Sequence, residues 1–140
     1  MKCGWDGSRS ELLSYLMANL SFLSNDYGAR LVDSKVRGPD AALVLETGDL
    51  RIRLVRDRGQ LFLDFKSRHN PSEEDWFSFD MVRQLITGEI IDAAELDDVK
   101  VRFVKDHFAA IAEAFSPSNQ TDTEKKLHRY ENARAKRLFG

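Results

Sequence analysis

The chain has 140 residues, of which 42% are hydrophobic and 31% are charged, and its formal net charge is −2 at pH 7. This size and composition suit one folded domain with its own hydrophobic core. The single cysteine excludes an intramolecular disulfide, and the lack of an apolar run of about 18 residues argues against a membrane-spanning helix. Because the first residues, MKCGWDGSRS, also lack the apolar core of a signal peptide, we expect a cytoplasmic protein.

The first expected element is an N-terminal amphipathic helix. Ser8 and Glu11 have the spacing of a capping box, in which the two side chains satisfy backbone amides of the first turn. Apolar residues then recur at helical spacing and form one stripe: Leu12, Leu13, Leu16, Met17, Leu20 and Leu23. Gly28 is expected to end the helix, because glycine readily adopts the left-handed conformation of a helix C-cap.

Four extended runs follow the helix, and short turns separate them. The expected strands cover residues 30–36, 41–47, 50–56 and 60–66. The separators between them are rich in turn-forming residues: Gly38-Pro39-Asp40, Gly48-Asp49 and Asp57-Arg58-Gly59. Separators this short join antiparallel neighbours, so the sequence predicts a four-stranded antiparallel meander.

The alternation of apolar and polar residues predicts how the strands pair. A turn at Gly48-Asp49 places Leu45 opposite Ile52 and Leu43 opposite Leu54. A turn at Asp57-Arg58 would place Ile52 opposite Leu63 and Leu54 opposite Leu61. One face would then bury Leu43, Leu45, Ile52, Leu54, Leu61, Leu63 and Phe65. The other face would carry a row Glu46–Arg51–Asp64 beside a row Val44–Arg53–Phe62, with the arginine of the first row between two carboxylates.

Helices are expected in the remainder of the chain. A short helix from about residue 78 to 87 ends at Gly88, and Asp92 and Glu95 form a second capping box. The longer helix that this box opens has an apolar stripe, and Pro117 ends it: Leu96, Val99, Phe103, Phe108, Ile111 and Phe115. A last helix starts at Thr121-x-x-Glu124 and runs toward Leu138, with a thin apolar stripe of Leu127, Tyr130 and Leu138.

These elements predict an α+β fold, with an N-terminal helix, a four-stranded antiparallel meander and two to three helices packed on one face of the sheet. Residues 1–117 are expected to form a single α+β domain. Residues 118–140 are expected to form a basic C-terminal helix, which could be semi-detached from that domain. The stretch 116–120, SPSNQ, is the one flexible candidate between them.

One string in the sequence matches the signature of metal-dependent nucleases. Pro39-Asp40 followed by Asp64-Phe65-Lys66 spells PD…(D/E)xK, whose two carboxylates must converge within about 5 Å on one divalent metal. In the predicted register, Asp40 lies at the sheet end of the turn at Asp57-Arg58, and Asp64 lies about 20 Å away. We therefore interpret the stretch as a β-hairpin and not as a nuclease site.

No other catalytic or metal-binding pattern stands out. The three histidines, His69, His107 and His128, are too far apart in sequence for a helical metal-binding pair. Gly-x-Ser-x-Gly and phosphate-binding glycine motifs are absent. The sequence thus predicts no catalytic residue, no metal ligand and no cofactor.

The most distinctive charge feature is an acidic stretch that contains aromatic residues. Residues 71–100 carry nine acids and two bases, a local net of −7, whereas residues 118–140 have a net of +3. Within the acidic stretch, Glu73, Glu74 and Asp75 directly precede Trp76 and Phe77. These five residues are the predicted partner-binding surface, since aromatic anchors with a polar rim are typical of protein interfaces.

A structural reading of the same five residues stays open. The acids would then complement the dipole of a following helix, and the aromatic pair would belong to the core. The chain as a whole lacks the basic excess of nucleic-acid-binding proteins, so nucleic acid is not the expected partner.

The order of elements resembles that of bacterial immunity proteins of polymorphic toxin systems. The resemblance is carried by the N-terminal amphipathic helix, the stretch LRIRLVRDRGQLFLDF and the stretch EEDWFSFDMVRQLITG, and it covers about residues 8–115. It implies a cytosolic, non-enzymatic protein that binds and blocks a cognate toxin, often through an acidic surface.

The expected function is therefore a non-catalytic protein-binding module, of the inhibitor or immunity type, with a protein partner such as a toxin. One alternative is a small enzyme or ligand-binding domain whose pocket lies between the sheet and the helices. Another is a nucleic-acid-associated accessory protein that uses the basic tail. The sequence leaves the oligomeric state open.

Overall fold

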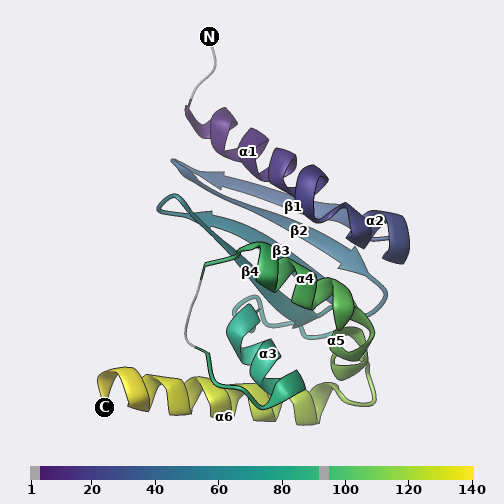
Figure 1. The fold of residues 1–140 in the computed structure, drawn as a ribbon, viewed down its shortest axis with the longest axis vertical. Coiled ribbons are helices and arrows are strands. Elements are labelled where there is room, and N and C mark those ends of the chain that lie inside the picture. The colour runs from purple at the N-terminus through teal and green to yellow at the C-terminus, as the bar shows by residue number, and fades with distance from the viewer. Residues whose placement is uncertain (1–3, 92–94) are drawn as a thin grey trace.

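The computed structural model describes residues 4–91 and 95–140, without the side chains of residues 4–8. The fold is α+β, with an N-terminal helical segment, an antiparallel meander and a C-terminal group of helices, as the sequence predicts (Figure 1). The elements are α1 (Gly4–Asn19), α2 (Ser21–Tyr27), β1 (Arg30–Arg37), β2 (Asp40–Thr47), β3 (Leu50–Asp57), β4 (Gln60–Ser67), β5 (Phe77–Ser78), α3 (Phe79–Thr87), α4 (Asp98–Asp106), α5 (Phe108–Ala114) and α6 (Gln120–Phe139).

The N-terminal helix starts earlier than the capping box predicts. Helix α1 begins at Gly4, so Ser8 lies inside the helix and the prediction that it caps the first turn is wrong. The expected single helix is also interrupted at Leu20, which is the N-cap of α2. The predicted end is confirmed, because Gly28 closes α2 with a left-handed φ of 68°. Of the predicted apolar stripe, Met17 is 75% exposed and does not belong to the core.

The sheet contains the four predicted strands and a fifth, very short one. The strand order is β1-β2-β3-β4-β5, with each strand antiparallel to its neighbour. Strand β5 has two residues, of which Phe77 pairs with Phe65 and Ser78 pairs with Asp64 of β4. Two residues are too few to show an alternating pattern, so the sequence does not reveal this strand.

The predicted pairing of β2 with β3 is confirmed, and that of β3 with β4 is wrong by two residues. Leu45 pairs with Ile52 as expected, but Ile52 pairs with Phe65 on its other side, and not with Leu63. The cause is the turn, which is Arg58-Gly59 and not Asp57-Arg58. Both turn residues have positive φ, 53° and 80°. This is the type I′ geometry, whose twist matches that of the flanking strands.

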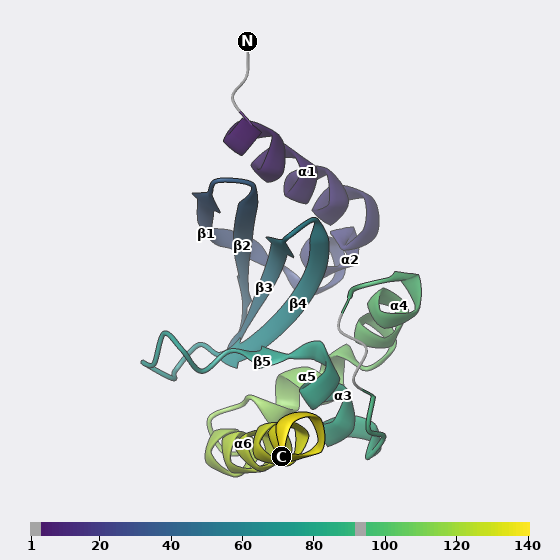
Figure 2. The same cartoon turned by 90° about the vertical axis from the view of Figure 1, so that its left-hand side faces the viewer.

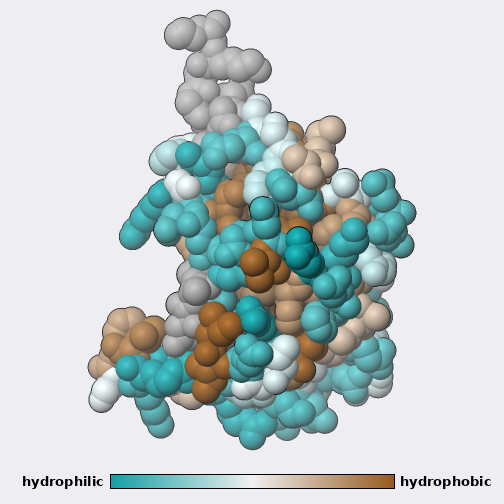
Figure 3. Space-filling view, in the orientation of Figure 1, coloured by the Kyte–Doolittle hydropathy of each residue, from teal (hydrophilic) through white to brown (hydrophobic). Residues whose placement is uncertain are grey.

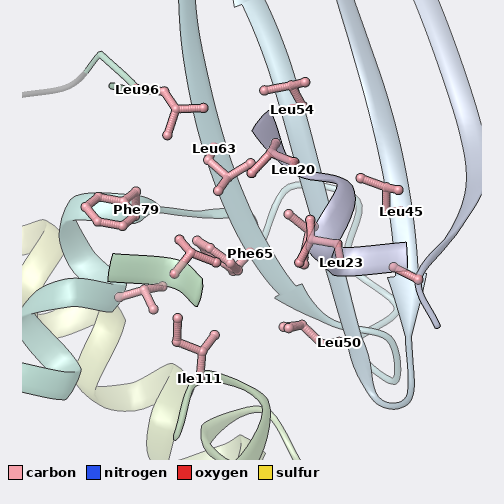
Figure 4. Close-up of a cluster of buried hydrophobic side chains, with 14 of the residues drawn as sticks. Leu20, Leu23, Leu45, Leu50, Leu54, Leu63, Phe65, Phe79, Leu96 and Ile111 are labelled. Carbon is pink, nitrogen blue, oxygen red and sulfur yellow. The ribbon is translucent and has the colours of Figure 1, made fainter. Parts of the chain in front are cut away.

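A shift of two residues keeps every side chain on its predicted face, because side chains alternate with a period of two. The expected core face is therefore confirmed. Six of its side chains are buried: Leu43, Leu45, Ile52, Leu54, Leu63 and Phe65. Leu61 is partly buried against them. Figure 4 shows that Leu20 and Leu23, from the N-terminal segment, meet the sheet leucines from one side, while Phe79 and Ile111 approach from the C-terminal helices.

The helices cover one face of the sheet and one end of it. In Figure 2, α1, α2 and α4 all lie on the right-hand side of the sheet. Helices α3, α5 and α6 gather below β5, and α3 contacts β4, β5, α5 and α6. Among the described residues, no helix lies over the left-hand face of the sheet in this view. The candidate site lies on this uncovered face.

The expected helix after residue 92 is two shorter helices. Asp97 is the N-cap of α4, and its carboxylate accepts a hydrogen bond from the Lys100 amide at 2.9 Å. The helix thus begins later than the proposed capping box, of which Asp92 lies outside the described residues. His107 separates α4 from α5. Val99 is 67% exposed, so its expected place in the apolar stripe is wrong, whereas Leu96, Phe108, Ile111 and Phe115 are buried.

Helix α6 packs against the remainder of the protein through its first half. Thr123 and Leu127 are buried, and the Thr123 hydroxyl donates a hydrogen bond to the Ala114 carbonyl at 2.6 Å. Farther along the helix, Leu138 is 52% exposed and Phe139 is 87% exposed. The expected apolar stripe is therefore not buried at Leu138. Among the helices of the described residues, none is long and apolar enough to cross a membrane.

Candidate functional site

The five residues predicted to bind a partner lie in different environments. Glu73 and Glu74 are exposed, while Asp75 and Trp76 are half-buried. Phe77 is 1% exposed and pairs with Phe65 inside the sheet, so its assignment to a contact surface is corrected to the core. The helix-dipole interpretation of the three acids is also wrong, because α3 begins only at Phe79 and the dipole acts within about one turn.

The acidic stretch does not form one continuous surface. Ser72, at its start, lies beside the end of β4, since its carbonyl accepts a hydrogen bond from Lys66. Leu96 lies beside the start of β4, because its amide donates to the Leu61 carbonyl at 2.7 Å. These two positions on β4 are five residues apart, or about 17 Å. The acids near residue 73 and those near residue 97 therefore belong to opposite ends of the sheet.

The uncovered face of the sheet brings together a different set of side chains, which we call the open face. They alternate with the core residues along the three central strands: Val44, Glu46, Arg51, Arg53, Val55, Phe62, Asp64 and Lys66. Figure 2 shows the segment that joins β4 to β5 projecting on this side of the sheet. On the opposite, helical side, Figure 3 shows apolar side chains in separate patches among polar ones.

One ion pair lies at the centre of the open face. Arg53 pairs across the strands with Asp64, and its Nε and Nη2 donate hydrogen bonds to Asp64 Oδ2 at 3.1 and 2.8 Å. The predicted row Glu46–Arg51–Asp64 is thus wrong, because Arg51 faces Lys66 in the observed register. Burial raises the pKa of Asp64, although the neighbouring Arg53 opposes this shift. Arg53 thus stabilises the charged form of this partly buried carboxylate.

A second charged group surrounds Glu46. Its carboxylate is 3.0 Å from Arg51 Nε, 3.2 Å from Arg30 Nη2 and 3.7 Å from Arg68 Nη1. The hydrogen bond from Arg51 is the main reason why the pKa of Glu46 lies below its ordinary value. Of the predicted row, the structure confirms the contact between Glu46 and Arg51. This cluster fixes one end of the open face through three strands and the loop after β4.

Trp76 lies against the cations of the open face. The guanidinium carbon of Arg53 is 4.6 Å from the centroid of the Trp76 ring, and Lys66 Nζ is 5.8 Å from it. Lys66 is 4% exposed, and this burial lowers its pKa. An aromatic ring stacked on cations gains electrostatic attraction in addition to its contact area. Trp76 is thus held over the sheet in a partly buried position.

Polar contacts tie the segment that carries Trp76 to the last helix. The Asn70 side-chain amide donates hydrogen bonds to Asp75 at 3.1 Å and to Glu124 of α6 at 2.8 Å. His128 of α6 lies 3.5 Å from Asp75 and 3.1 Å from Glu131. Sequence reasoning missed these supports. Asn70 and Glu124 are 54 residues apart, and no local pattern connects them.

A cavity of about 420 Å³ lies between the open face and α6. Its lining combines the sheet, β5, α3 and α6: Arg53, Asp64, Trp76, Ser78, Met81, Glu131, Arg134, Ala135, Leu138 and Phe139. Burial raises the pKa of Glu131, as it does for Asp64. A second hollow, of about 300 Å³, lies on the other side of Trp76 and is lined by β1, β2, β3, Lys66 and Glu73.

The two carboxylates of the nuclease-like string, Asp40 and Asp64, lie at different positions along the sheet, as the predicted geometry requires. Asp40 accepts a hydrogen bond from the Arg58 amide at 3.1 Å, so it sits at the turn between β3 and β4. Asp64 lies farther up β4 and pairs with Arg53. In residues 4–91 and 95–140, no group of three or more histidine, cysteine, aspartate or glutamate side chains is placed to hold a metal ion.

The fold and its surface define a small α+β protein with an antiparallel meander that is covered on one face and open on the other. No protein-family model, curated protein or solved structure matches the chain. The functional proposal therefore rests on the chemistry of the open face.

Proposed function

We propose that the chain is a non-catalytic protein-binding module that binds its partner through the open face, around Trp76 and Arg53. The observation that carries the proposal is the partly buried Trp76 ring stacked on the Arg53 guanidinium at 4.6 Å. Tryptophan and arginine are the residue types most enriched among those that dominate binding energies at protein interfaces. Here they meet on the open face, beside the cavity that α6 borders.

The charges around Trp76 favour an acidic group on the partner. The hollow of about 300 Å³ is lined by four cations and two carboxylates: Lys35, Arg51, Arg53, Lys66, Asp33 and Glu73. Arg51 and Arg53 already pair with Glu46 and Asp64, so a carboxylate of the partner that enters this hollow would be attracted mainly by Lys35 and Lys66. The sequence instead predicted a contact surface around the acids Glu73, Glu74 and Asp75. The separation of the acids along the sheet weakens that prediction.

An inhibitor or immunity-type role in the cytoplasm fits such a module, and a toxin is then the partner. The resemblance in element order supports this class. The rim acids Glu73 and Glu74 would tune association, because exposed charge near an interface acts mainly on the association rate. Replacing both with glutamine should speed the association of an acidic partner and slow that of a basic one. An unchanged rate at low salt would mean that these acids are only solvated surface.

A ligand-binding domain is the second candidate, and one observation favours it. The cavity between the sheet and α6, about 420 Å³, has the size of a small-molecule site and combines apolar walls with a few charged groups. Trp76 and Arg53 line this cavity as well. A small ligand would therefore compete with a protein partner for the same two side chains.

The proposed function can be tested with matched variants as bait. The wild-type chain, Trp76→Ala and Val99→Ala are immobilised and exposed to a lysate of the native organism. Val99 is a suitable control because it is an exposed apolar residue on α4, on the other side of the sheet. A protein retained by the wild type and by Val99→Ala, but lost from Trp76→Ala, supports the proposal.

The same experiment can contradict it. A protein retained equally by all three baits, or retained by none, argues against binding through the open face. Circular dichroism and thermal unfolding of each bait show whether a loss of binding reflects a loss of folded protein. If Trp76→Ala lowers stability and leaves the affinity of the folded fraction unchanged, Trp76 is a structural residue only.

A further inference from the structure

Strand β1 forms one edge of the sheet, and no described segment pairs with its outer side. Most of its residues are exposed, including the apolar side chains of Leu31 (47%) and Val32 (38%). Helix α1 packs over β2 and touches β1 and β3 beside it, so it leaves the outer edge free. An edge strand presents unpaired amides and carbonyls that can pair with a further strand.

The backbone groups that point outward can be identified. The two-residue turn at Gly38-Pro39 joins Arg37 to Asp40, so Arg37 and Lys35 bond to β2 and the groups of Ser34 and Val36 point away from it. The Ser34 amide agrees with this assignment, because it donates a hydrogen bond to its neighbour Asp33 at 2.8 Å. The pairing with β2 is irregular between Leu31 and Asp33, so the regular outward-facing stretch is 33–37.

We propose that β1 pairs antiparallel with β1 of a second copy of the chain, around a two-fold axis at Ser34. In this register, Asp33 lies opposite Lys35 of the partner subunit, and Lys35 lies opposite Asp33 of the partner subunit. Both side chains project on the open face, where they line one hollow. They are 50% and 72% exposed, so they are accessible to a second copy. The charges of β1 are thus complementary to the charges of β1 in a second copy.

Each neighbouring register includes a like-charge pair. A two-fold axis at Asp33 would place two aspartates opposite each other. An axis at Lys35 would place two lysines opposite each other, although Asp33 would then lie opposite Arg37 on both sides. An axis at Val36 would place Lys35 opposite Arg37. Like charges on directly facing positions destabilise an antiparallel pair, whereas opposite charges stabilise it. The charges of β1 therefore favour the axis at Ser34, which pairs opposite charges and places no like charges opposite each other.

Pairing would give a dimer that cannot add further copies, and it would place the two open faces on the same side. Two identical antiparallel strands are related by an axis perpendicular to the sheet, so both open faces would point to the same side. Each hollow beside Trp76 would then border Lys35 of the partner subunit. The other edge of the sheet, β5, has two residues and lies against α3, so pairing would end at two copies and would not propagate. This inference does not depend on the proposed function.

Charge reversal on the full-length chain tests the register. Sedimentation velocity is measured over a range of concentrations for the wild type, Asp33→Lys, Lys35→Asp and the double variant Asp33→Lys/Lys35→Asp. We expect a wild-type dimer, an increase of about tenfold or more in the dissociation constant of each single variant, and recovery in the double variant. Because Asp33 and Lys35 also lie 3.9 Å apart within one chain, an equimolar mixture of the two single variants separates the two effects: it should form a heterodimer only if these residues pair between copies.

Ser34→Pro provides a second, independent test. Proline removes the outward amide of Ser34, which is not bonded to β2, so the fold should survive while the edge pairing is blocked. Circular dichroism checks the fold. A wild-type chain that stays monomeric up to about 100 µM overturns the proposal. So does a dimer that persists in Ser34→Pro or in both single charge variants, because it must then form through another surface.

Discussion

Glu46→Gln is the most informative single substitution for the open face. The Glu46 side chain is 9% exposed, and its carboxylate receives hydrogen bonds from Arg51 and Arg30, with Arg68 at 3.7 Å. Glutamine keeps the size of the side chain and one acceptor oxygen. It removes the negative charge, and it places an amide donor among guanidinium groups. The variant therefore tests how much the negative charge of Glu46 contributes to the free energy of unfolding.

The expected cost follows from the exposure of the partners. Hydrogen bonds to a charged group contribute about 1.5–3 kcal/mol when both groups are shielded from water. The arginine side chains here are 39%, 73% and 48% exposed, so solvent screens each pair. We expect a total loss of about 1–3 kcal/mol in the free energy of unfolding at pH 7, and a fall in Tm of about 3–10 °C.

The pH dependence makes the prediction specific. The pKa of Glu46 lies below its ordinary value of 4.5 in the folded protein, mainly because of the hydrogen bond from Arg51. A carboxylate of this kind stabilises the fold fully above its unfolded-state pKa, and the stabilisation is lost as the pH falls through the folded-state pKa. The difference between the wild type and Glu46→Gln should therefore be constant from pH 7 to about 5 and shrink below about pH 4.5.

Urea unfolding at several pH values measures this difference. Glu74→Gln is the matched control, because Glu74 is exposed and its substitution removes the same charge. The control should change the free energy of unfolding by about 0.5 kcal/mol or less. If Glu46→Gln is no more destabilising than Glu74→Gln, or if its effect grows as the pH falls, the assignment of a stabilising arginine cluster is refuted.

Three further comparisons test the register and the core by urea unfolding. Leu63→Ala should cost about 2–5 kcal/mol as a buried truncation, and Arg51→Ala no more than about 1 kcal/mol as a partly exposed ion pair; equal costs would contradict the assignment of faces. Phe77→Ala should cost about 3–5 kcal/mol, clearly more than Trp76→Ala at its partly buried position, and the reverse order would restore Phe77 to the contact surface. Arg58→Asn should raise stability by about 0.5–1 kcal/mol, because asparagine tolerates positive φ better, and a loss would argue against the type I′ turn.

The sequence predicts the strands and their faces well, and their exact pairing less well. The alternation from Leu50 to Lys66 determines which side chains are buried, because a period of two survives any shift by two residues. The pairing of Arg53 with Asp64 depends instead on whether the turn is Asp57-Arg58 or Arg58-Gly59. That choice requires positive φ at an arginine, which residue preferences do not favour.

The candidate site was only partly accessible to sequence reasoning. Trp76 stood out beside a run of acids, and the structure places it at the centre of the open face. Its aromatic neighbour Phe77 looked equivalent in sequence, but β5 directs it into the core. The support from Asn70 to Glu124 joins residues 54 positions apart, so it exists only once the chain is folded.

The meander has a consequence for the order of folding. Strands β1 to β4 pair with their sequence neighbours through two-residue turns, so most of the sheet forms from contacts that are close along the chain. Chains with local contacts close their loops at little entropic cost and fold quickly. The hydrogen bond from Asn70 to Glu124 requires a much longer loop to close. We expect the sheet to be in place early and Trp76 to reach its final position only when the last helix docks.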